Sequence, residues 1–130
     1  MYRLMITGSR TWDDKEVIVH ELLFIAKKYK NVVLVSGHAA GADRLAEEVA
    51  VGLGWVVEIH EPDWKLNGDS AGYKRNSTML ETGVQAVLAF HKDGSRGTAD
   101  AIRKAKDRKI PTRVLVETTP EWVGDWAVTV

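Results

Sequence analysis

The feature that most constrains this chain is a regular alternation of apolar runs of strand length with segments of helical periodicity. The strand-length runs are continuous rather than alternating, which is typical of strands buried on both faces of a parallel sheet. They lie at 4–7, 32–36, 55–59, 86–90 and 113–116. This order predicts an α/β fold, a Rossmann-like three-layer sandwich with a mostly parallel sheet and helices on both faces.

Glycine-bearing turns follow three of the expected strands, at 8–10, 37–43 and 94–98. The carboxyl ends of parallel strands meet at one edge of a sheet, and open α/β sheets bind their ligands beyond that edge. The third turn, GSRGT, opens a helix whose free N–H groups and positive dipole end favour an anion. We therefore expect a phosphate site there, with Thr98 capping the helix or donating its hydroxyl to the anion.

The composition bounds the size and class of the protein. A chain of 130 residues with 45% hydrophobic and 28% charged residues is expected to form one globular domain, spanning 1–130. The 18 basic and 18 acidic residues cancel, so a broad electrostatic surface for nucleic acid is not expected. Cysteine is absent, the four histidines lack metal-ligand spacing, and no signal-peptide or membrane-length apolar pattern is visible. We expect a cytoplasmic protein without a metal or cofactor.

Two segments fall outside the alternation. The stretch 61–73 holds proline and glycine without periodicity, and long ordered loops of this kind are usually functional. The tail carries Trp122 and Trp126, which we expect to pack on the body of the protein or on a partner subunit, and an edge strand is expected at 127–130.

Four short motifs resemble those of the SLOG superfamily and occur in the same order. They read ITGSR at 6–10, SGxAxGxD at 36–43, RNxxM at 75–79 and GSxGT at 94–98. The resemblance covers 4–111 and is to the small stand-alone branch related to YspA and YpsA. The superfamily also unites the Rossmann domain of DNA-processing protein A with the Lonely Guy phosphoribohydrolases. The resemblance implies a site for a nucleotide or nucleotide-derived ligand, and often a homodimer.

The resemblance to the Lonely Guy enzymes extends to part of their catalytic signature. Those enzymes hydrolyse the N-glycosidic bond of nucleoside monophosphates, and their signature places an Arg four residues before a Met, as Arg75 and Met79 stand here. Ala101 occupies the position of the family's catalytic Glu, and Asp100 precedes it by one residue, about a hundred degrees around a helix. The implied catalytic residues are Arg75 and, as the acid, Asp100, with Asp93 or Glu81 as alternatives.

The candidate ligand residues combine the three turns with the motif at 75–79. Arginine can hold a phosphate with a planar fork of donors, Asp43 can cap a helix or contact a ribose hydroxyl, and Asn76 can read a base edge or fix the long loop. Trp12 and Trp64 lie in connections, where a ring can stack on a base or close over the core. The full set of ligand candidates is Gly8, Ser9, Arg10, Gly37, Gly41, Asp43, Arg75, Asn76, Gly94, Ser95, Arg96, Gly97 and Thr98.

Three functions stay open on the sequence. The first is a binding module that senses a nucleotide or an ADP-ribose-like ligand without consuming it, which the missing Glu favours. The second is a phosphoribohydrolase in which Arg75 and the turn at 94–98 hold the 5′-phosphate. The third is single-stranded nucleic-acid binding, against which the zero net charge counts, so we do not expect nucleic acid as a partner.

Overall fold

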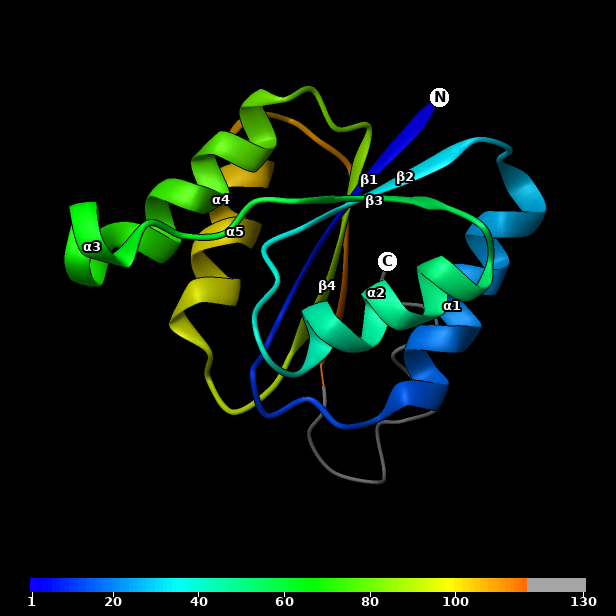
Figure 1. Cartoon of the computed structure of the whole chain (residues 1–130), viewed down its shortest axis with the longest axis horizontal. Coiled ribbons are helices and arrows are strands. Elements are labelled where there is room, and N and C mark those ends of the chain that lie inside the picture. Colours follow the sequence, from blue (N-terminus) through cyan, green and yellow to red (C-terminus); the bar gives the residue numbers. More distant parts are fainter. Residues whose placement is uncertain (117–130) are drawn as a thin grey trace.

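Helices cover both faces of one parallel sheet in the computed structural model, which describes residues 1–116 (Figure 1). The residues Trp122 and Trp126 and the edge strand expected at 127–130 lie outside the described part. Within residues 1–116, no helix combines the length and the apolar character needed to cross a membrane. In chain order the elements are β1 (Tyr2–Gly8), α1 (Lys15–Lys28), β2 (Val32–Ser36), α2 (Ala42–Gly52), β3 (Val56–Ile59), α3 (Trp64–Asn67), the 3-10 turn η1 (Gly68–Ser70), α4 (Ala71–Glu81), β4 (Ala86–His91), α5 (Arg96–Asp107) and β5 (Thr112–Val116).

All strand pairs in the described sheet are parallel, and the strand order is β3-β2-β1-β4-β5. The strand β1 is central, with Met5 in register with Val35 on β2 and with Val87 on β4. The chain leaves β1 on one side and returns on its other side with β4, so the strand order reverses between them. Open α/β sheets bind ligands at such a switch point. The predicted Rossmann-like sandwich is confirmed.

Each face of the sheet has its own hydrophobic layer. The helices α1 and α2 cover one face, where Ile6 and Phe90 are buried, and α4 and α5 cover the other, where Met5 packs with Met79 and Ala101 (Figure 1). Successive side chains of a strand point to opposite faces, so neighbouring residues such as Met5 and Ile6 serve different layers. This arrangement explains why the strand sequences are continuous apolar runs.

The helix α2 packs on the sheet through small side chains, namely Ala42, Ala46 and Ala50, which are fully buried. Small side chains let the helix approach β1 closely. A Cβ atom built on Gly8 would lie only 2.4 Å from the Cβ of Ala42. This close approach places the beginning of α2 directly beside the carboxyl end of β1.

The stretch 61–73 is largely helical rather than a long loop. It contains α3, the 3-10 turn and the start of α4. The helix α3 begins where the Asp63 carboxylate accepts a hydrogen bond from the Leu66 N–H at 3.0 Å. A helix of one turn is too short to produce a sequence periodicity, which is why the pattern did not indicate it.

Candidate ligand site at the carboxyl edge of the sheet

Two adjoining cavities, each of about 340 Å³, lie at the carboxyl edge of the sheet. The first cavity is formed by the loop after β1, the start of α2, the first part of α4 and the connection from β4 into α5. The second cavity is formed by the connection from β2 into α2 and by residues that follow β3. Arg10, Ala39, Trp64 and Arg75 line both cavities. The three glycine turns therefore meet at one edge, as their places in the sequence predict.

The loops that follow β1 and β4 are joined at the switch point. The Ser9 hydroxyl donates to the carbonyl of Lys92 and accepts from the N–H of Lys92, both at 2.6 Å. The Thr11 hydroxyl donates to the Asp93 carboxylate at 2.7 Å. Ser9 is buried, and its hydroxyl already donates and accepts at this junction. Its contribution to the first cavity is therefore to fix the shape of the wall.

Arg75 is the cation at the centre of the site. Its Nη1 donates to the Gly37 carbonyl at 2.7 Å, and its Nε donates to the Asn76 side chain at 3.1 Å. A Cβ atom on Gly37 would lie 2.1 Å from that Nη1, so the close approach requires glycine. Burial lowers the pKa of Arg75 while Asp43 nearby raises it, and a guanidinium stays charged through such shifts. Gly37 lines neither cavity, and it serves the site by admitting Arg75.

Asp43 is a buried acid in the wall of the first cavity, with only 4% of its surface exposed. Its Oδ2 accepts a hydrogen bond from the Ala39 N–H at 3.1 Å, whereas Oδ1 has no hydrogen-bond partner among residues 1–116. Burial raises the pKa of Asp43 to about 7, although the Ala39 N–H and the Arg75 charge act in the opposite direction. A buried acceptor without a partner costs free energy, so Oδ1 is suited to a donor from a ligand.

The α5 helix begins at the first cavity with its own cap in place. Ser95 accepts a hydrogen bond from the Thr98 N–H at 3.3 Å, and the two hydroxyls are 2.9 Å apart. The cap is therefore Ser95 and not Thr98, which is buried in the first turn. A Cβ atom on Gly97 would meet no atom within 4 Å, so this residue leaves open space in the cavity. Gly94 and Arg96, which we predicted to contact ligand, line neither cavity.

The α2 helix begins without a side-chain cap. Its N-cap is Gly41, with φ of 81° and ψ of −126°, a conformation that residues with a side chain avoid. A Cβ atom there would lie 2.4 Å from the carbonyl oxygens of Ser9 and Arg10. No side chain caps the helix, neither that of Asp43 nor any at Gly41, and the Ala42 N–H at the start of α2 donates to the Ser9 carbonyl at 3.2 Å.

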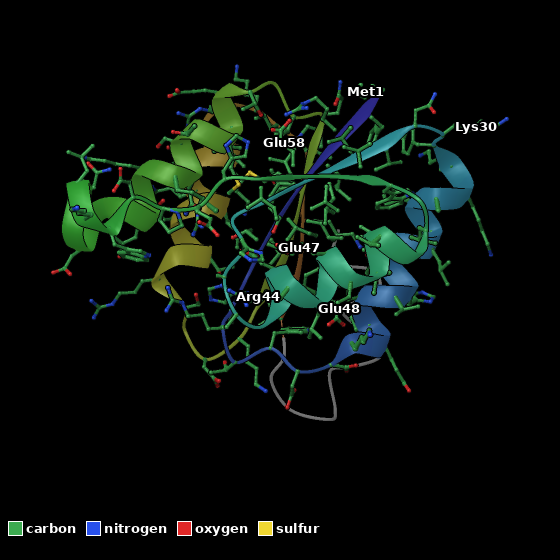
Figure 2. All side chains as sticks on the ribbon, in the orientation of Figure 1. Met1, Lys30, Arg44, Glu47, Glu48 and Glu58 are labelled. Atoms are coloured by element: carbon green, nitrogen blue, oxygen red, sulfur yellow. The ribbon has the colours of Figure 1, made fainter. Side chains whose placement is uncertain are left out.

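A polar network holds the connection between β2 and α2 in place. The Glu47 carboxylate accepts from the Ser36 hydroxyl at 2.7 Å and lies 2.7 Å from Nδ1 of His38. This contact engages Nδ1 of His38 and leaves Nε2 of the ring for other groups. His38 and Arg44 both line the second cavity, and the sequence reasoning missed them (Figure 2 labels Arg44 and Glu47 on α2). The available signal was Glu47, a carboxylate that stands with Asp43 among the buried alanines of α2.

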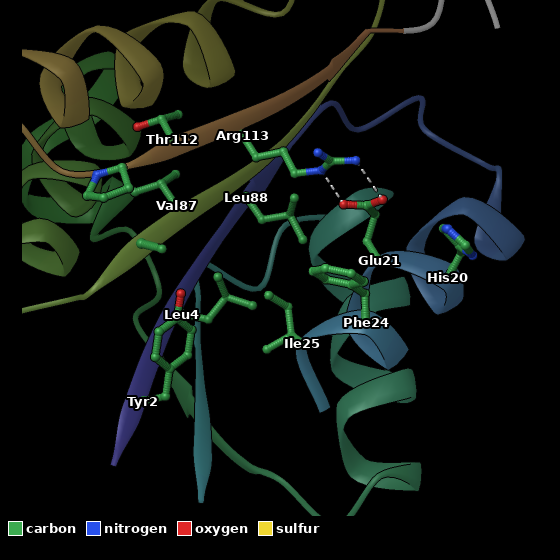
Figure 3. A pocket seen from close by; sticks show the side chains of 12 residues that line it. Tyr2, Leu4, His20, Glu21, Phe24, Ile25, Val87, Leu88, Thr112 and Arg113 are labelled. Carbon is green, nitrogen blue, oxygen red and sulfur yellow. Dashed lines mark hydrogen bonds and ion pairs between the residues drawn. The ribbon is translucent and has the colours of Figure 1, made fainter. Parts of the chain in front are cut away.

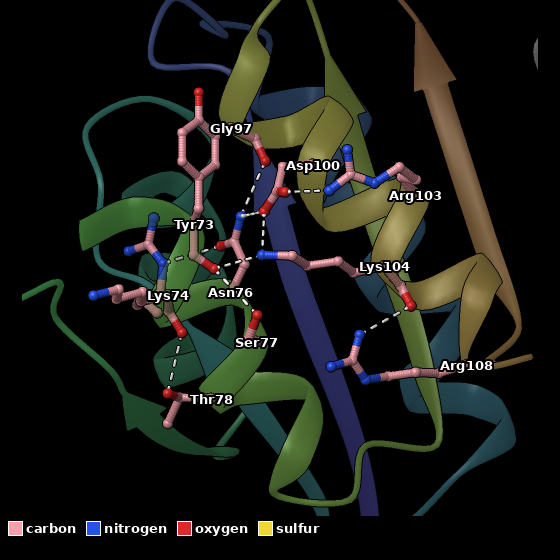
Figure 4. A network of polar contacts seen from close by, with 11 residues as sticks. Tyr73, Lys74, Asn76, Ser77, Thr78, Gly97, Asp100, Arg103, Lys104 and Arg108 are labelled. Carbon is pink, nitrogen blue, oxygen red and sulfur yellow. Dashed lines mark hydrogen bonds and ion pairs between the residues drawn. The ribbon is translucent and has the colours of Figure 1, made fainter. Parts of the chain in front are cut away.

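Asn76 and Asp100 join α4 to α5 and line neither cavity (Figure 4). The Asn76 amide donates to the Gly97 carbonyl at 3.1 Å and to the Asp100 carboxylate at 3.2 Å. That carboxylate also pairs with Arg103 at 2.8 Å and with Lys104 at 2.9 Å. The structure therefore shows the Asp100 carboxylate held in ion pairs and the Asn76 amide engaged at the junction of α4 and α5, with neither side chain in the wall of either cavity.

The two alternative acids are placed differently. Asp93 lines the first cavity beside Thr11. Glu81 is exposed at the end of α4, next to Thr82, which accepts a hydrogen bond from Arg3 near the start of β1, at the opposite edge of the sheet. Within residues 1–116 no group of three or more His, Asp or Glu side chains is placed to hold a metal ion.

The two tryptophans of the connections have opposite environments. Trp12 is buried with its ring centroid 5.2 Å from that of Phe90, so of the two alternatives for this ring the structure shows closing over the core. Trp64 is 50% exposed and lines both cavities, with the Arg10 guanidinium 5.9 Å from its ring centroid. Trp64 is the ring available for stacking.

A larger cavity of about 500 Å³ lies between α1 and the sheet (Figure 3). Apolar side chains such as Leu4 and Ile25 form much of its wall, and Arg113 donates to the Glu21 carboxylate, with Nη2 at 3.2 Å. Residues from the beginnings of β1, β4 and β5 line it, so it is remote from the carboxyl edge. Its charged pair is already satisfied, whereas several polar side chains converge on the two smaller cavities.

Comparison with known proteins agrees with this architecture. The sequence model of the YspA, cpYpsA-related SLOG family matches residues 2–66. The gene 61 protein of Mycobacterium phage D29 is 37% identical over 117 residues, which cover 85% of this chain and 94% of the phage protein.

Two solved structures of DNA processing protein A share the fold. The one from Streptococcus pneumoniae has a TM-score of 0.75 at 14% identity, over 97% of this chain and 54% of that one. The one from Helicobacter pylori, described for its single-stranded DNA binding mode, has a TM-score of 0.69 at 18% identity, over 95% of this chain and 72% of that one. This chain thus spans about half the length of the pneumococcal protein.

Proposed function

Because the chain belongs to the YspA, cpYpsA-related SLOG family, we propose that it binds a nucleotide or nucleotide-derived phosphorylated ligand at the carboxyl edge of its sheet. The observation that carries this proposal is the presence of both Arg75 and Asp43 in the wall of the first cavity. A partly buried guanidinium and a buried carboxyl with an unpartnered oxygen together suit a ligand that has both an anionic group and a hydrogen-bond donor.

In the proposed function, the protein binds its ligand without converting it into a product. A phosphoribohydrolase needs an acid at the ribosyl carbon, and the Asp100 carboxylate is instead paired with Arg103 and Lys104. Of the acids that the sequence suggested for catalysis, Asp93 is the one that lines the first cavity. Chromatography after incubation with nucleoside monophosphates tests this point. We expect the nucleotides to be recovered intact, and release of free base that Asp93→Asn abolishes would instead establish the hydrolase.

The central test of the proposal is calorimetric titration with nucleoside monophosphates and ADP-ribose. Arg75→Ala should weaken binding by about 1.5–3 kcal/mol, or roughly ten- to a hundredfold, because a charge-assisted hydrogen bond is lost. Arg75→Lys should recover part of the affinity, since a point charge does not reproduce a bidentate fork. Arg108→Ala is the matched control, because this exposed arginine lies at the far end of α5. Equal affinity in the wild type and both Arg75 variants would refute the site.

Single-stranded DNA is the second candidate ligand. It is favoured by the exposed Trp64 ring between two cavities that share Arg10 and Arg75, and by the DNA binding reported for the structurally similar Helicobacter pylori protein. Zero net charge does not exclude it, because arginines gathered at one edge create a local basic site. Fluorescence anisotropy with labelled oligothymidylate decides between the candidates. Tighter binding than that of any mononucleotide, lost in Trp64→Ala, would favour DNA.

The expected homodimer and cytoplasmic location remain part of this proposal. A homodimer is implied by resemblance to the family alone, and light scattering at high micromolar concentration tests it. A monomer under those conditions would contradict that part of the proposal.

A further inference from the structure

The two cavities at the carboxyl edge differ in charge. In the first cavity the cations Arg10, Arg75 and Lys92 face the carboxyl groups of Asp43, Asp69 and Asp93. In the second cavity Arg10, Arg44 and Arg75 face one carboxylate, that of Glu61. A doubly charged phosphate is attracted to an excess of cations and repelled by nearby carboxylates. The second cavity is thus the more favourable place for it, although the sequence motif at 94–98 belongs to the first.

The second cavity also lies beside a helix N-terminus, where the N–H groups of His38, Ala39 and Ala42 already donate to Ser36, Asp43 and Ser9. Residues 38–40 and Arg44 line it, so it lies at the N-terminal end of α2, an 11-residue helix that lacks a side-chain cap. Arg44 stands in the first turn of this helix, exposed, with its Nε directed to the His38 carbonyl at 3.3 Å. The positive end of the α2 helix dipole adds to the attraction of the arginines. At α5 the acceptor is a side chain, since the Ser95 hydroxyl satisfies the Thr98 N–H, whereas at α2 it is the Ser9 carbonyl.

Asp43 supplies an independent indication of how a ligand is oriented. It stands next to Arg44 in the same helical turn, yet it lines the first cavity and its buried Oδ1 lacks a hydrogen-bond partner among residues 1–116. A carboxyl oxygen repels a phosphate and accepts a hydrogen bond from a hydroxyl. The first turn of α2 therefore offers a hydroxyl acceptor to one cavity and cations to the other.

From this arrangement we propose that the ligand's phosphate binds in the second cavity, on Arg10, Arg44 and the first turn of α2, while Asp43 accepts a hydrogen bond from a sugar hydroxyl in the first cavity. The inference rests on the proposed nucleotide-binding function and gives it an orientation and a ligand class. The class is a ribonucleoside phosphate, because a ligand without sugar hydroxyls leaves Asp43 unsatisfied. The phosphate then lies away from the turn at 94–98.

The test first identifies which of AMP, GMP, CMP and UMP binds most tightly. That monophosphate, the corresponding nucleoside and the 2′,3′-dideoxy analogue of the monophosphate are then titrated by calorimetry. Arg44→Ala should weaken the monophosphate tenfold or more and leave the nucleoside within twofold. Arg96→Ala makes the same change in the first turn of α5 and is the matched control, expected to stay within twofold for both ligands. Asp43→Asn places an amide donor where the acceptor was, so it should remove the preference for the monophosphate over its dideoxy analogue.

The outcomes separate this inference from the function on which it rests. Weakening by Arg96→Ala or Gly97→Val, with Arg44→Ala unaffected, would place the phosphate at α5 and overturn the inference while leaving nucleotide binding intact. If none of the four monophosphates binds the wild type at millimolar concentration, the proposed function fails and the inference fails with it. Arg44→Lys guards against a folding artefact, because it keeps the charge and should retain part of the affinity lost in Arg44→Ala.

Discussion

The helices α2 and α5 both begin at the carboxyl edge of the sheet after a glycine-bearing turn, but the two turns are built for different purposes. The α5 turn caps its own helix with Ser95, and a Cβ atom on Gly94 would meet nothing within 4 Å. The α2 turn has no side-chain cap, and Gly41 is enclosed by backbone. A glycine turn before a helix is therefore not enough to predict an anion site, because a side-chain cap can already occupy an N–H group that an anion would bind.

The two glycines should differ most in their tolerance of alanine. Gly41→Ala forces a positive φ on a residue with a side chain and brings its Cβ within 2.4 Å of two carbonyl oxygens. We expect it to destabilise the protein by about 3–5 kcal/mol, from backbone strain and overpacking together. Gly94→Ala, with φ of 60° and no crowding, should cost about 1–2 kcal/mol. Urea unfolding measures both, and equal losses would show that the turns are built alike.

Asp43 should give the α2 turn a dependence on pH. The unfolded carboxyl loses its proton near its ordinary pKa of 3.8, whereas the folded one retains it up to about 7. The folded state thus binds more protons between these values, and stability falls as the pH rises through this range. Relative to Asp43→Asn, the wild type should lose about 2–4 kcal/mol of unfolding free energy between pH 4.5 and 7.5. If the free energy of unfolding changes equally with pH in the two proteins, the pKa of Asp43 is not raised in the folded state.

Ser95→Ala, which alters the turn before α5, should have the smallest effect on stability of the substitutions considered. Removal of the N-cap should cost about 1 kcal/mol of stability, because the Thr98 N–H loses its acceptor. Nucleotide affinity should stay within twofold of the wild type, since the proposed phosphate position is at α2. Calorimetric titration beside urea unfolding separates the two readouts, and a tenfold loss of affinity would return the phosphate to the α5 turn.

Sequence reasoning predicted the parallel sheet and the meeting of the three turns because both follow from apolar runs and chain order alone. It could not predict that Trp12 packs on Phe90 or that Asp100 pairs with Arg103 and Lys104. Those contacts depend on how closely helices approach the sheet and each other. The burial of the Asp43 Oδ1 atom without a hydrogen-bond partner depends likewise on packing around the turn before α2.

The hydrogen bonds between Ser9 and Lys92 join positions 83 residues apart in the chain, and this separation has a consequence for synthesis on the ribosome. Until β4 emerges, β1 has a partner on one side only and is an edge strand open to wrong pairing. The wall of the first cavity contains residues up to Thr98, so a nascent chain has no complete site until most of the protein has been made. Ligand capture by ribosome-bound chains of increasing length would therefore report when β4 has docked beside β1.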